Sequence, residues 1–393
     1  MKAIILASGQ WSRLKPLTDT TPKPLLKVLG KSLIEHNLES LDGLVNECII
    51  VVKYMPEAFK SALWDKYGNI SIKYHLQWED NGTAAAIKDI DIIEDEDILV
   101  LYGDTIYPQI ELKKVIHSQD YGCLVKHVEN PEIYGIFQEE NWYAQKVVEK
   151  PTQHIWNLAN MAGYKFSGEI IEMCKHVPIS QRGEYEITDA LNTFIAKHPF
   201  KLHNIDNDLL DIWYAWNLLD ANNSYLWELS ESTINWEIED NVTIHGNIIL
   251  EEGAIIKSGT YIEWNCYFWK NTIIGPNAYI RGNTSLWEWG KIWFSVEVKN
   301  SYIWENSKIP HLSYLWDSII WNNVNLGGWF KVANLRHDGK NMKVMVKWKL
   351  IDSGKRKLWC IIWDNVKTAI NTQIYPGRIL ETGSSTLPGE TIR

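Results

Sequence analysis

The sequence predicts a Rossmann-like α/β domain followed by a left-handed parallel β-helix of hexapeptide repeats. Residues 1 to about 210 alternate short β-branched runs with helix-like stretches, the pattern of βαβ units. From residue 238 onward, aliphatic or aromatic residues recur at every sixth position. Neither a helix nor a flat strand produces this period, whereas a β-helix does.

The α/β part contains four clear candidate strands, which are Ala3–Leu6, Cys48–Val52, Ile70–Tyr74 and Ile98–Tyr102. Polar, helix-like stretches separate them. This alternation predicts a mostly parallel sheet that is covered by helices on both faces.

In the predicted β-helix, an apolar residue recurs at every sixth position, and this spacing is shortened by one residue at two places. Every sixth residue of such a coil points into one interior column, and stacked coils bury a continuous core. The predicted interior positions are Ile238, Ile244, Leu250, Ile256, Ile262, Phe268, Ile274, Ile280, Leu286, Ile292, Val298, Ile303, Ile309, Leu315, Ile320, Leu326 and Val332.

The predicted domains are residues 1–227, residues 228–380 and a C-terminal tail of residues 381–393. A polar insertion at residues 334–341 interrupts the period. Loops expelled from a solenoid often carry function on one face, so this loop is a candidate part of a site.

Composition excludes several classes of protein. The chain has 393 residues, of which 45% are hydrophobic and 22% are charged, as in a soluble globular protein. A net charge of -10 argues against nucleic-acid binding. No apolar run approaches the roughly 20 residues needed to span a bilayer. Five scattered cysteines without metal-ligand spacing suit the reducing cytoplasm.

The first candidate strand runs into a loop suited to phosphate binding. Gly9 allows a phosphate to approach the backbone N–H groups that follow Leu6 and Ala7. Arg13 and Lys23 supply positive charge nearby in the sequence. A glycine loop after a strand is by itself weak evidence, because many sheet proteins contain one.

The combination of motifs is more specific. LASGxxSRLxPLT followed by TPKPLL resembles the signature of the sugar-1-phosphate nucleotidylyltransferases, and the resemblance extends over the whole first domain. It implies nucleotide binding by Leu6, Ala7, Gly9, Gln77, Gly82, Thr83 and Gly103. It implies sugar binding by Gly135, Glu149, Lys150 and Asn160. The segment from Arg182 to Asp189 resembles the GEYExTD stretch of the same family.

This resemblance implies transfer of a nucleotidyl group from UTP or dTTP to glucose-1-phosphate or N-acetylglucosamine-1-phosphate, with release of pyrophosphate. Asp104 and Asp211 are expected to hold Mg²⁺, a cation that prefers oxygen ligands and phosphates. Arg13 and Lys23 are expected to be catalytic, because they stabilise charge on the leaving pyrophosphate.

The β-helix part resembles the acetyltransferase half of bifunctional enzymes that also acetylate glucosamine-1-phosphate. Residues 310–318 look like their GHLxYLGD segment, and residues 325–328 look like NIGAG. The resemblance implies that His311 is the general base for acetyl transfer from acetyl-CoA. It implies substrate binding by Arg281, Lys299, Tyr314, Asn325, Gly328, Asn334 and Lys340. It also implies a homotrimer, and archaeal-type members share this two-domain plan.

Tryptophan is unusually frequent, with 21 residues against 24 glycines. Many tryptophans stand where the family has glycine, so the sequence suggests that a UGA codon meaning glycine has been printed as tryptophan. Trp216 matches a tryptophan of the family. The alternative is a real tryptophan-rich chain with remodelled loops. The suspect positions are Trp11, Trp213, Trp269, Trp287, Trp293, Trp304, Trp316, Trp321 and Trp363.

Two other functions remain open at this level. One is a single-activity nucleotidylyltransferase whose β-helix is only a scaffold. The other is a non-catalytic regulatory homologue, which Trp11 taken literally favours and which intact Arg13, Lys23, Asp104 and Asp211 oppose.

Overall fold

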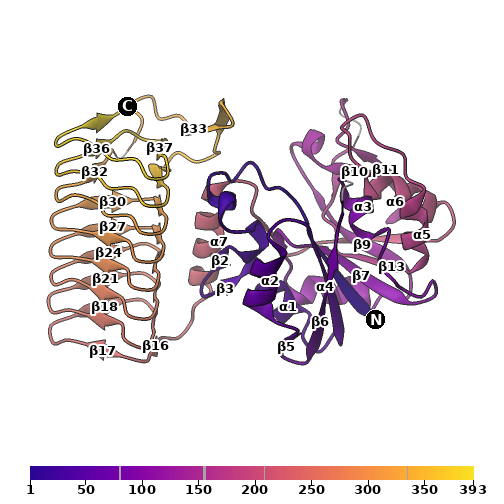
Figure 1. The fold of residues 1–393 in the computed structure, drawn as a ribbon, viewed down its shortest axis with the longest axis horizontal. Helices are drawn as coiled ribbons and strands as arrows, with labels where there is room; N and C mark the ends of the chain where they lie inside the picture. The colour runs from indigo at the N-terminus through magenta and orange to yellow at the C-terminus, as the bar shows by residue number, and fades with distance from the viewer. Residues whose placement is uncertain (79–80, 154–155, 208, 334) are drawn as a thin grey trace. The chain divides into compact units, whose positions relative to one another are not determined.

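The computed structural model describes residues 1–393 except 79–80, 154–155, 208 and 334 (Figure 1). Contacts divide the chain into two compact units. The first unit comprises residues 1–11, 21–26 and 31–211, and the second comprises residues 12–20, 27–30 and 212–393. Helix α7 (Ala215–Trp227), expected at the end of the first domain, groups with the second unit by its contacts.

The first unit is built on one mixed sheet. Its described strands follow the order β12 (Leu158–Asn160), β10 (Gly135–Glu140), β11 (Tyr143–Glu149), β14 (Phe200–Asn204), β9 (Tyr121–His127), β13 (Tyr164–Ser167), β7 (Asp97–Tyr102), β1 (Lys2–Ala7), β4 (Glu47–Val52), β6 (Ile70–Leu76) and β5 (Lys66–Tyr67). The helices are α1 (Leu33–Ser40), α2 (Pro56–Leu63), α3 (Thr83–Ile87), α4 (Gln109–Ile116), α5 (Glu169–Lys175) and α6 (Ile187–Ile195). Shorter elements are η2 (Lys23–Leu25), β3 (Lys31–Ser32), β8 (Thr105–Ile106), η3 (Pro131–Ile133) and β15 (Leu210–Asp211).

All four candidate strands are confirmed as β1, β4, β6 and β7. These four are parallel to one another, with β1 between β4 and β7. The expectation of a mostly parallel sheet is nevertheless wrong for the rest of this sheet, where most strand pairs are antiparallel. Strand β13 pairs antiparallel with β7, and β10 pairs antiparallel with β11. The buried runs of β1, β4 and β7 are continuous because both faces of this part are covered.

The second unit is a left-handed parallel β-helix with three stacked sheets. One contains β16 (Thr233–Ile234), β19 (Ile248–Leu250), β22 (Cys266–Phe268), β25 (Thr284–Leu286), β28 (Tyr302–Ile303), β31 (Ile319–Ile320), β35 (Cys360–Ile362) and β37 (Arg378–Leu380). The next contains β17 (Glu237–Ile238), β20 (Ile255–Ile256), β23 (Ile273–Ile274), β26 (Lys291–Ile292) and β29 (Lys308–Ile309). The third contains β18 (Thr243–His245), β21 (Tyr261–Glu263), β24 (Tyr279–Arg281), β27 (Glu297–Lys299), β30 (Tyr314–Trp316), β32 (Lys331–Val332), β36 (Gln373–Ile374) and β38 (Thr391–Ile392).

The strands from β18 to β36 form a ladder (Figure 1), and their register places Ile262 opposite Ile280 and Ile280 opposite Val298. The predicted interior positions all belong to, or pack against, one apolar core, so the six-residue period is confirmed. A hairpin of β33 (Lys343–Val346) and β34 (Lys349–Asp352) follows the interruption. The unit also contains η1 (Leu17–Asp19), β2 (Lys27–Val28) and α7.

The expectation of a tail at residues 381–393 is wrong, because these residues continue the β-helix. Strand β38 pairs with β36, and Lys367 and Ser385 form a parallel bridge. The inserted hairpin of residues 343–352 separates this last part of the β-helix from the regular six-residue repeat that ends at Val332.

All five cysteines are buried thiols without a disulfide. Within the described residues, no helix is long and apolar enough to cross a membrane.

Candidate active sites

Lys23 lies between the two carboxylates that were predicted to bind a metal. Its Nζ atom is 2.7 Å from Oδ2 of Asp104 and 4.0 Å from Oδ1 of Asp211. The Lys23 side chain is only 5% exposed, whereas the side chains of Asp104 and Asp211 are 34% and 24% exposed. Because a buried ammonium is costly without partners, this cluster fixes the lysine and keeps both carboxylates open to a ligand.

The local chain path explains how these three residues meet. Lys23 begins η2, Asp104 follows the buried strand β7, and Asp211 ends β15. Strand β15 pairs with β8 directly after β7, with Asp211 opposite Thr105. The pairing therefore brings the second carboxylate to the carboxyl end of the parallel strands, where open α/β sheets bind ligands.

The predicted nucleotide-binding residues occupy tight turns at the same sheet. Gly103 donates its N–H to the Leu6 carbonyl at 2.9 Å, and a Cβ on Gly103 would stand 2.9 Å from that oxygen. Gly82 has φ +114°, and a Cβ there would meet the backbone of Tyr185 at 2.3 Å. Thr83 accepts the Ile187 N–H on its hydroxyl at 2.9 Å. Glycine is needed at both turns because the backbones touch.

Two other predicted residues of this set lie at strand ends. Ala7 ends β1 and is fully buried. Gln77 follows β6, is 6% exposed, and donates its backbone N–H to the Val52 carbonyl at 2.9 Å.

Three of the predicted sugar-binding residues gather around one point. Gly135 pairs with Glu149 across β10 and β11. A Cβ on Gly135 would lie 3.0 Å from Glu149 Oε2 and 3.6 Å from Asn160 Cβ. Lys150 follows with φ +46°, and its Nζ is 3.6 Å from Glu149 Oε1. The absence of a side chain at Gly135 thus lets Glu149, Thr188 and Asn160 come close together at this point.

Two further residues, Arg182 and Tyr164, hold the predicted sugar-binding side chains in place, although neither was predicted from the sequence as a site residue. Arg182 lies 3.4 Å from Glu149 Oε1 and 2.5 Å from Glu186 Oε1, so it orients the carboxylate that faces Gly135. Tyr164 accepts a hydrogen bond from Asn160 Nδ2 at 2.6 Å and fixes that amide. Burial raises the pKa of Tyr164, which keeps the phenol neutral. Arg182 belongs to the quoted GEYExTD stretch, whereas Tyr164 had no sequence signal.

The phosphate loop is filled by an aromatic side chain. Trp11 has φ +44°, and its Nε1 atom is 2.8 Å from the position of a Cβ on Gly9. The indole therefore lies directly against the glycine that was expected to admit a phosphate. Arg13, which belongs to the second unit, has its guanidinium 5.0 Å from the centre of the Trp213 ring.

In the β-helix, the predicted phosphate-binding cations are register partners. Arg281 pairs with Lys299 across β24 and β27, and Lys299 pairs with Trp316 across β27 and β30. Both cations face the Trp316 ring, at 5.0 Å and 4.9 Å from its centre. Burial, reinforced by nearby Lys357 and Arg281, lowers the pKa of Lys299. Each cation also lies near a carboxylate, with Arg281 3.7 Å from Glu297 and Lys299 3.9 Å from Asp317.

Tyr314 starts the same strand as Trp316, and burial raises its pKa to about 12. His311 lies at the preceding corner of the coil, exposed, with its ring 5.7 Å from that of Trp293. A Cβ on Gly328 would lie 3.7 Å from the His311 carbonyl oxygen, so this glycine lies beside the histidine.

The remaining predicted acetyltransferase residues are more dispersed. Asn325 bridges Lys308 and Lys367 on the neighbouring coils. Lys340 is exposed and donates its backbone N–H to Asp338. Asn334 lies outside the described residues. A cavity of about 550 Å³ lies beside the insertion that interrupts the repeat. It is lined by Leu335, Lys355, Arg356 and Lys357.

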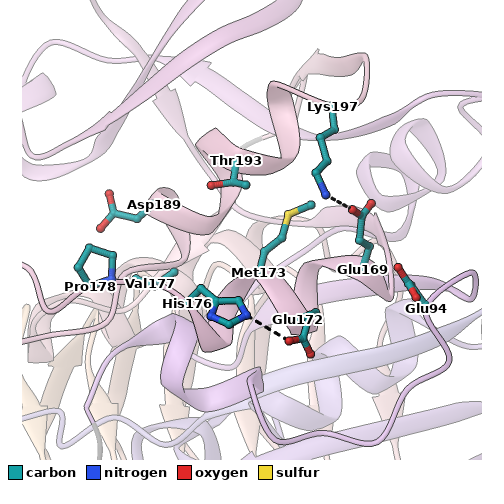
Figure 2. Close-up of a pocket in the computed structure, with 10 residues that line it drawn as sticks. All are labelled: Glu94, Glu169, Glu172, Met173, His176, Val177, Pro178, Asp189, Thr193 and Lys197. Atoms are coloured by element: carbon teal, nitrogen blue, oxygen red, sulfur yellow. Dashed lines mark hydrogen bonds and ion pairs between the residues drawn. The ribbon is translucent and has the colours of Figure 1, made fainter.

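A separate cavity of about 330 Å³ lies at α5 and α6 of the first unit, and none of the predicted site residues lines it (Figure 2). Two of its four acidic residues, Glu169 and Glu172, form ion pairs. Glu169 accepts hydrogen bonds from Lys197 and His198, and Glu172 from Lys175 and His176. These pairs make the cavity a structural feature of the helix surface.

The pairing of Glu169 predicts a pH-dependent contribution to stability. Lys197 and then His198 hold its pKa below the ordinary value. Because the folded pKa is depressed, the contribution is present above the unfolded pKa of about 4.3 and is lost as pH falls through the folded pKa. We expect Glu169→Gln to lower the free energy of unfolding by about 1 kcal/mol at pH 7, with the difference vanishing in acid. Urea unfolding at several pH values measures this.

Glu172→Gln is the matched control, since Glu172 lies on the same helix but is 58% exposed. It is expected to leave stability unchanged. A deficit for Glu169→Gln that persisted unchanged at pH 3 would contradict the electrostatic explanation.

The parallel strands, the glycine turns at their carboxyl ends and the lysine held by two carboxylates define a nucleotidyl transferase type of site. The profile of the nucleotidyl transferase family matches residues 2–228. A bifunctional sugar-1-phosphate nucleotidylyltransferase/acetyltransferase of Sulfurisphaera tokodaii is 40% identical over 100% of this chain and 97% of its own length. The bifunctional protein GlmU of Methanocaldococcus jannaschii is 39% identical over 96% of this chain and 91% of its own length.

Solved structures support the fold of the first unit. A UDP-glucose pyrophosphorylase in complex with UDP-glucose superposes with a TM-score of 0.54 at 22% identity, over 58% of this chain and 99% of its own. The UDP-glucose pyrophosphorylase from Acinetobacter baumanii has a TM-score of 0.51 at 19% identity, over 58% of this chain and 94% of its own. The chain belongs to the family of bifunctional sugar-1-phosphate nucleotidylyltransferase/acetyltransferases.

Proposed function

We propose that the two units act in sequence on one amino sugar. The β-helix transfers an acetyl group from acetyl-CoA to glucosamine-1-phosphate. The first unit then transfers a uridylyl or thymidylyl group from the nucleoside triphosphate to the acetylated sugar phosphate, and pyrophosphate leaves. The observation that carries the first activity is Lys23 held between Asp104 and Asp211 at the carboxyl edge of the sheet.

The chemistry at that cluster is mainly positioning and charge neutralisation. The sugar phosphate oxygen attacks the α-phosphorus in line, so the enzyme needs little covalent participation. Asp104 and Asp211 are oxygen donors that already bind a cation, the Lys23 ammonium, which is the behaviour expected of residues that hold Mg²⁺. When bound, Mg²⁺ neutralises charge on the phosphates. Lys23 is placed to stabilise the same charge from the protein side.

The sugar is expected to lie over Gly135. Glu149 and Asn160 flank the space that the missing side chain leaves, and they would accept and donate hydrogen bonds to sugar hydroxyls. Arg182 holds Glu149 in place, and Tyr164 holds Asn160. Such support keeps polar groups fixed before the substrate arrives.

In the β-helix, Arg281 and Lys299 are positioned to bind the phosphate of the amino sugar, because they are stacked register partners on one sheet. His311 would accept a proton from the amine as it attacks the acetyl carbonyl, a role suited to a near-neutral imidazole. Coenzyme A leaves as the thiol. A homotrimer that brings further residues to this site belongs to the same proposal.

Metal removal separates the two activities. We expect a chelator to abolish pyrophosphate release from UTP and N-acetylglucosamine-1-phosphate, and to leave CoA release from acetyl-CoA and glucosamine-1-phosphate intact. The physical reason is that Asp104 and Asp211 would hold the metal at the first site, whereas Arg281 and Lys299 would bind the sugar phosphate in the β-helix. Both products are measured on the natively produced protein, with dTTP beside UTP. Pyrophosphate release that survives the chelator would contradict the metal role of Asp104 and Asp211.

A further inference from the structure

We infer that the functional protein carries glycine at most of the positions printed here as tryptophan, including Trp11 and Trp316 at its two active sites. The sequence alone suggested this from a family resemblance. Backbone geometry, buried polar atoms and site occupancy now support it on independent grounds.

Two hairpin turns give the most direct observation. Strands β10 and β11 are joined by Asn141 and Trp142, with φ +53° and +65°, and Glu140 pairs with Tyr143 across the turn. A two-residue turn with both φ values positive is type I′, for which Asn-Gly is the preferred sequence. Trp142 is 45% exposed, so burial of its indole does not compensate for the conformation.

The hairpin of β33 and β34 repeats this geometry elsewhere in the chain. Lys347 and Trp348 have φ +48° and +62°, and Val346 pairs with Lys349. Trp348 is 95% exposed, which leaves it no packing partner of consequence. The second turn position is again a tryptophan where a residue without Cβ fits best.

Positive φ is common among the tryptophans of this chain. Seven of the 21 adopt it, whereas a bulky residue in that region is ordinarily an outlier. The seven are Trp11, Trp64, Trp142, Trp264, Trp289, Trp329 and Trp348. Because L-residues other than Asn and Asp rarely visit this region, one common cause is a better explanation than seven separate strains.

Not every suspect tryptophan has a strained backbone. The tryptophans that follow interior positions of the β-helix, such as Trp269 and Trp316, are not among the residues with positive φ. Among this group, the difficulty is instead an unsatisfied polar group. The indole Nε1 atom of Trp321 is buried without a hydrogen-bond partner among the described residues. Buried indole N–H groups normally find one.

Trp216 behaves differently, as a genuine tryptophan should. It lies inside α7 at ordinary helical φ and is 4% exposed. Its ring stacks on Tyr214 with centres 4.5 Å apart.

The two active sites show the functional consequence, a step that rests on the proposed function. The Trp11 indole lies against Gly9, and the centre of the Trp316 ring is 5.0 Å from the Arg281 guanidinium and 4.9 Å from Lys299 Nζ. Glycine at position 11 exposes the loop N–H groups to a triphosphate. Glycine at position 316 removes the aromatic ring that both cations contact and makes room beside them for the phosphate of a sugar. A single codon read as glycine accounts for these positions together.

Peptide sequencing by mass spectrometry of the natively produced protein tests the inference. We expect glycine after Asn141, after Lys347 and at positions 11 and 316, and tryptophan at position 216. Tryptophan after both Asn141 and Lys347 would overturn the inference. The result does not depend on activity, so it is independent of whether the proposed function is correct.

A second test uses recombinant chains. Starting from the printed sequence, Trp142→Gly and Trp348→Gly are each expected to shift the urea midpoint of unfolding upward, because they relieve a strained turn without emptying a core. Trp216→Gly, the matched control, is expected to shift it downward. Downward shifts for all three would show that the turns tolerate tryptophan and would contradict the inference.

Discussion

Lys23→Ala is expected to lower kcat/KM for nucleotidyl transfer by about 100- to 1,000-fold, the loss that follows removal of one preorganised group that stabilises transition-state charge. The substitution removes the ammonium that lies 2.7 Å from Asp104 and leaves two carboxylates facing the phosphates. Pyrophosphate release measures the effect. The background is the glycine-restored chain, which carries glycine wherever peptide sequencing finds it.

Lys15→Ala is the matched control, since Lys15 is 57% exposed and pairs only with neighbouring Asp19 among the interactions described. It is expected to keep full activity. Lys23→Met preserves apolar bulk at the buried position and separates lost charge from lost packing. Activity near that of the parent chain in both Lys23 variants would remove this residue from the mechanism.

His311→Ala is expected to lower acetyl transfer by about 100- to 10,000-fold, the range for loss of a general base. Nucleotidyl transfer should be unchanged, because His311 lies in the β-helix unit. CoA release from acetyl-CoA and glucosamine-1-phosphate is the measurement, again in the glycine-restored chain.

His245→Ala serves as the control for His311, since it removes another exposed histidine of the same β-helix, beside Tyr261. It should retain acetyl transfer. Equal losses in the two variants would indicate a general effect on the β-helix, and no loss in His311→Ala would exclude it as the base.

The sequence predicted the repeating parts of the fold better than the irregular ones. Period six depends only on local spacing, so the interior column from Ile244 to Val332 could be read directly. The antiparallel pairing of β13 with β7 depends on residues far apart in the chain, and no local pattern specifies it. Residues 381–393 were predicted as a tail because the β33–β34 hairpin separates the last coils from the regular repeat.

The first candidate site was predictable in part. The motifs named Lys23, Asp104 and Asp211, and the structure brings the three side chains together. The supporting contact of Tyr164 with Asn160 was not predictable, because it depends on the order of strands in the sheet. For the second site, the register of Arg281 and Lys299 follows from the repeat. The roles of His311 and Asn334 still rest on resemblance.

The most direct test of two consecutive activities on one chain is a single reaction containing glucosamine-1-phosphate, acetyl-CoA, UTP and Mg²⁺ with the glycine-restored protein. We predict release of both CoA and pyrophosphate, with the pyrophosphate depending on acetyl-CoA. Pyrophosphate release from N-acetylglucosamine-1-phosphate by a protein that never releases CoA would contradict the account. It would reduce the β-helix to a scaffold for the nucleotidyl transferase.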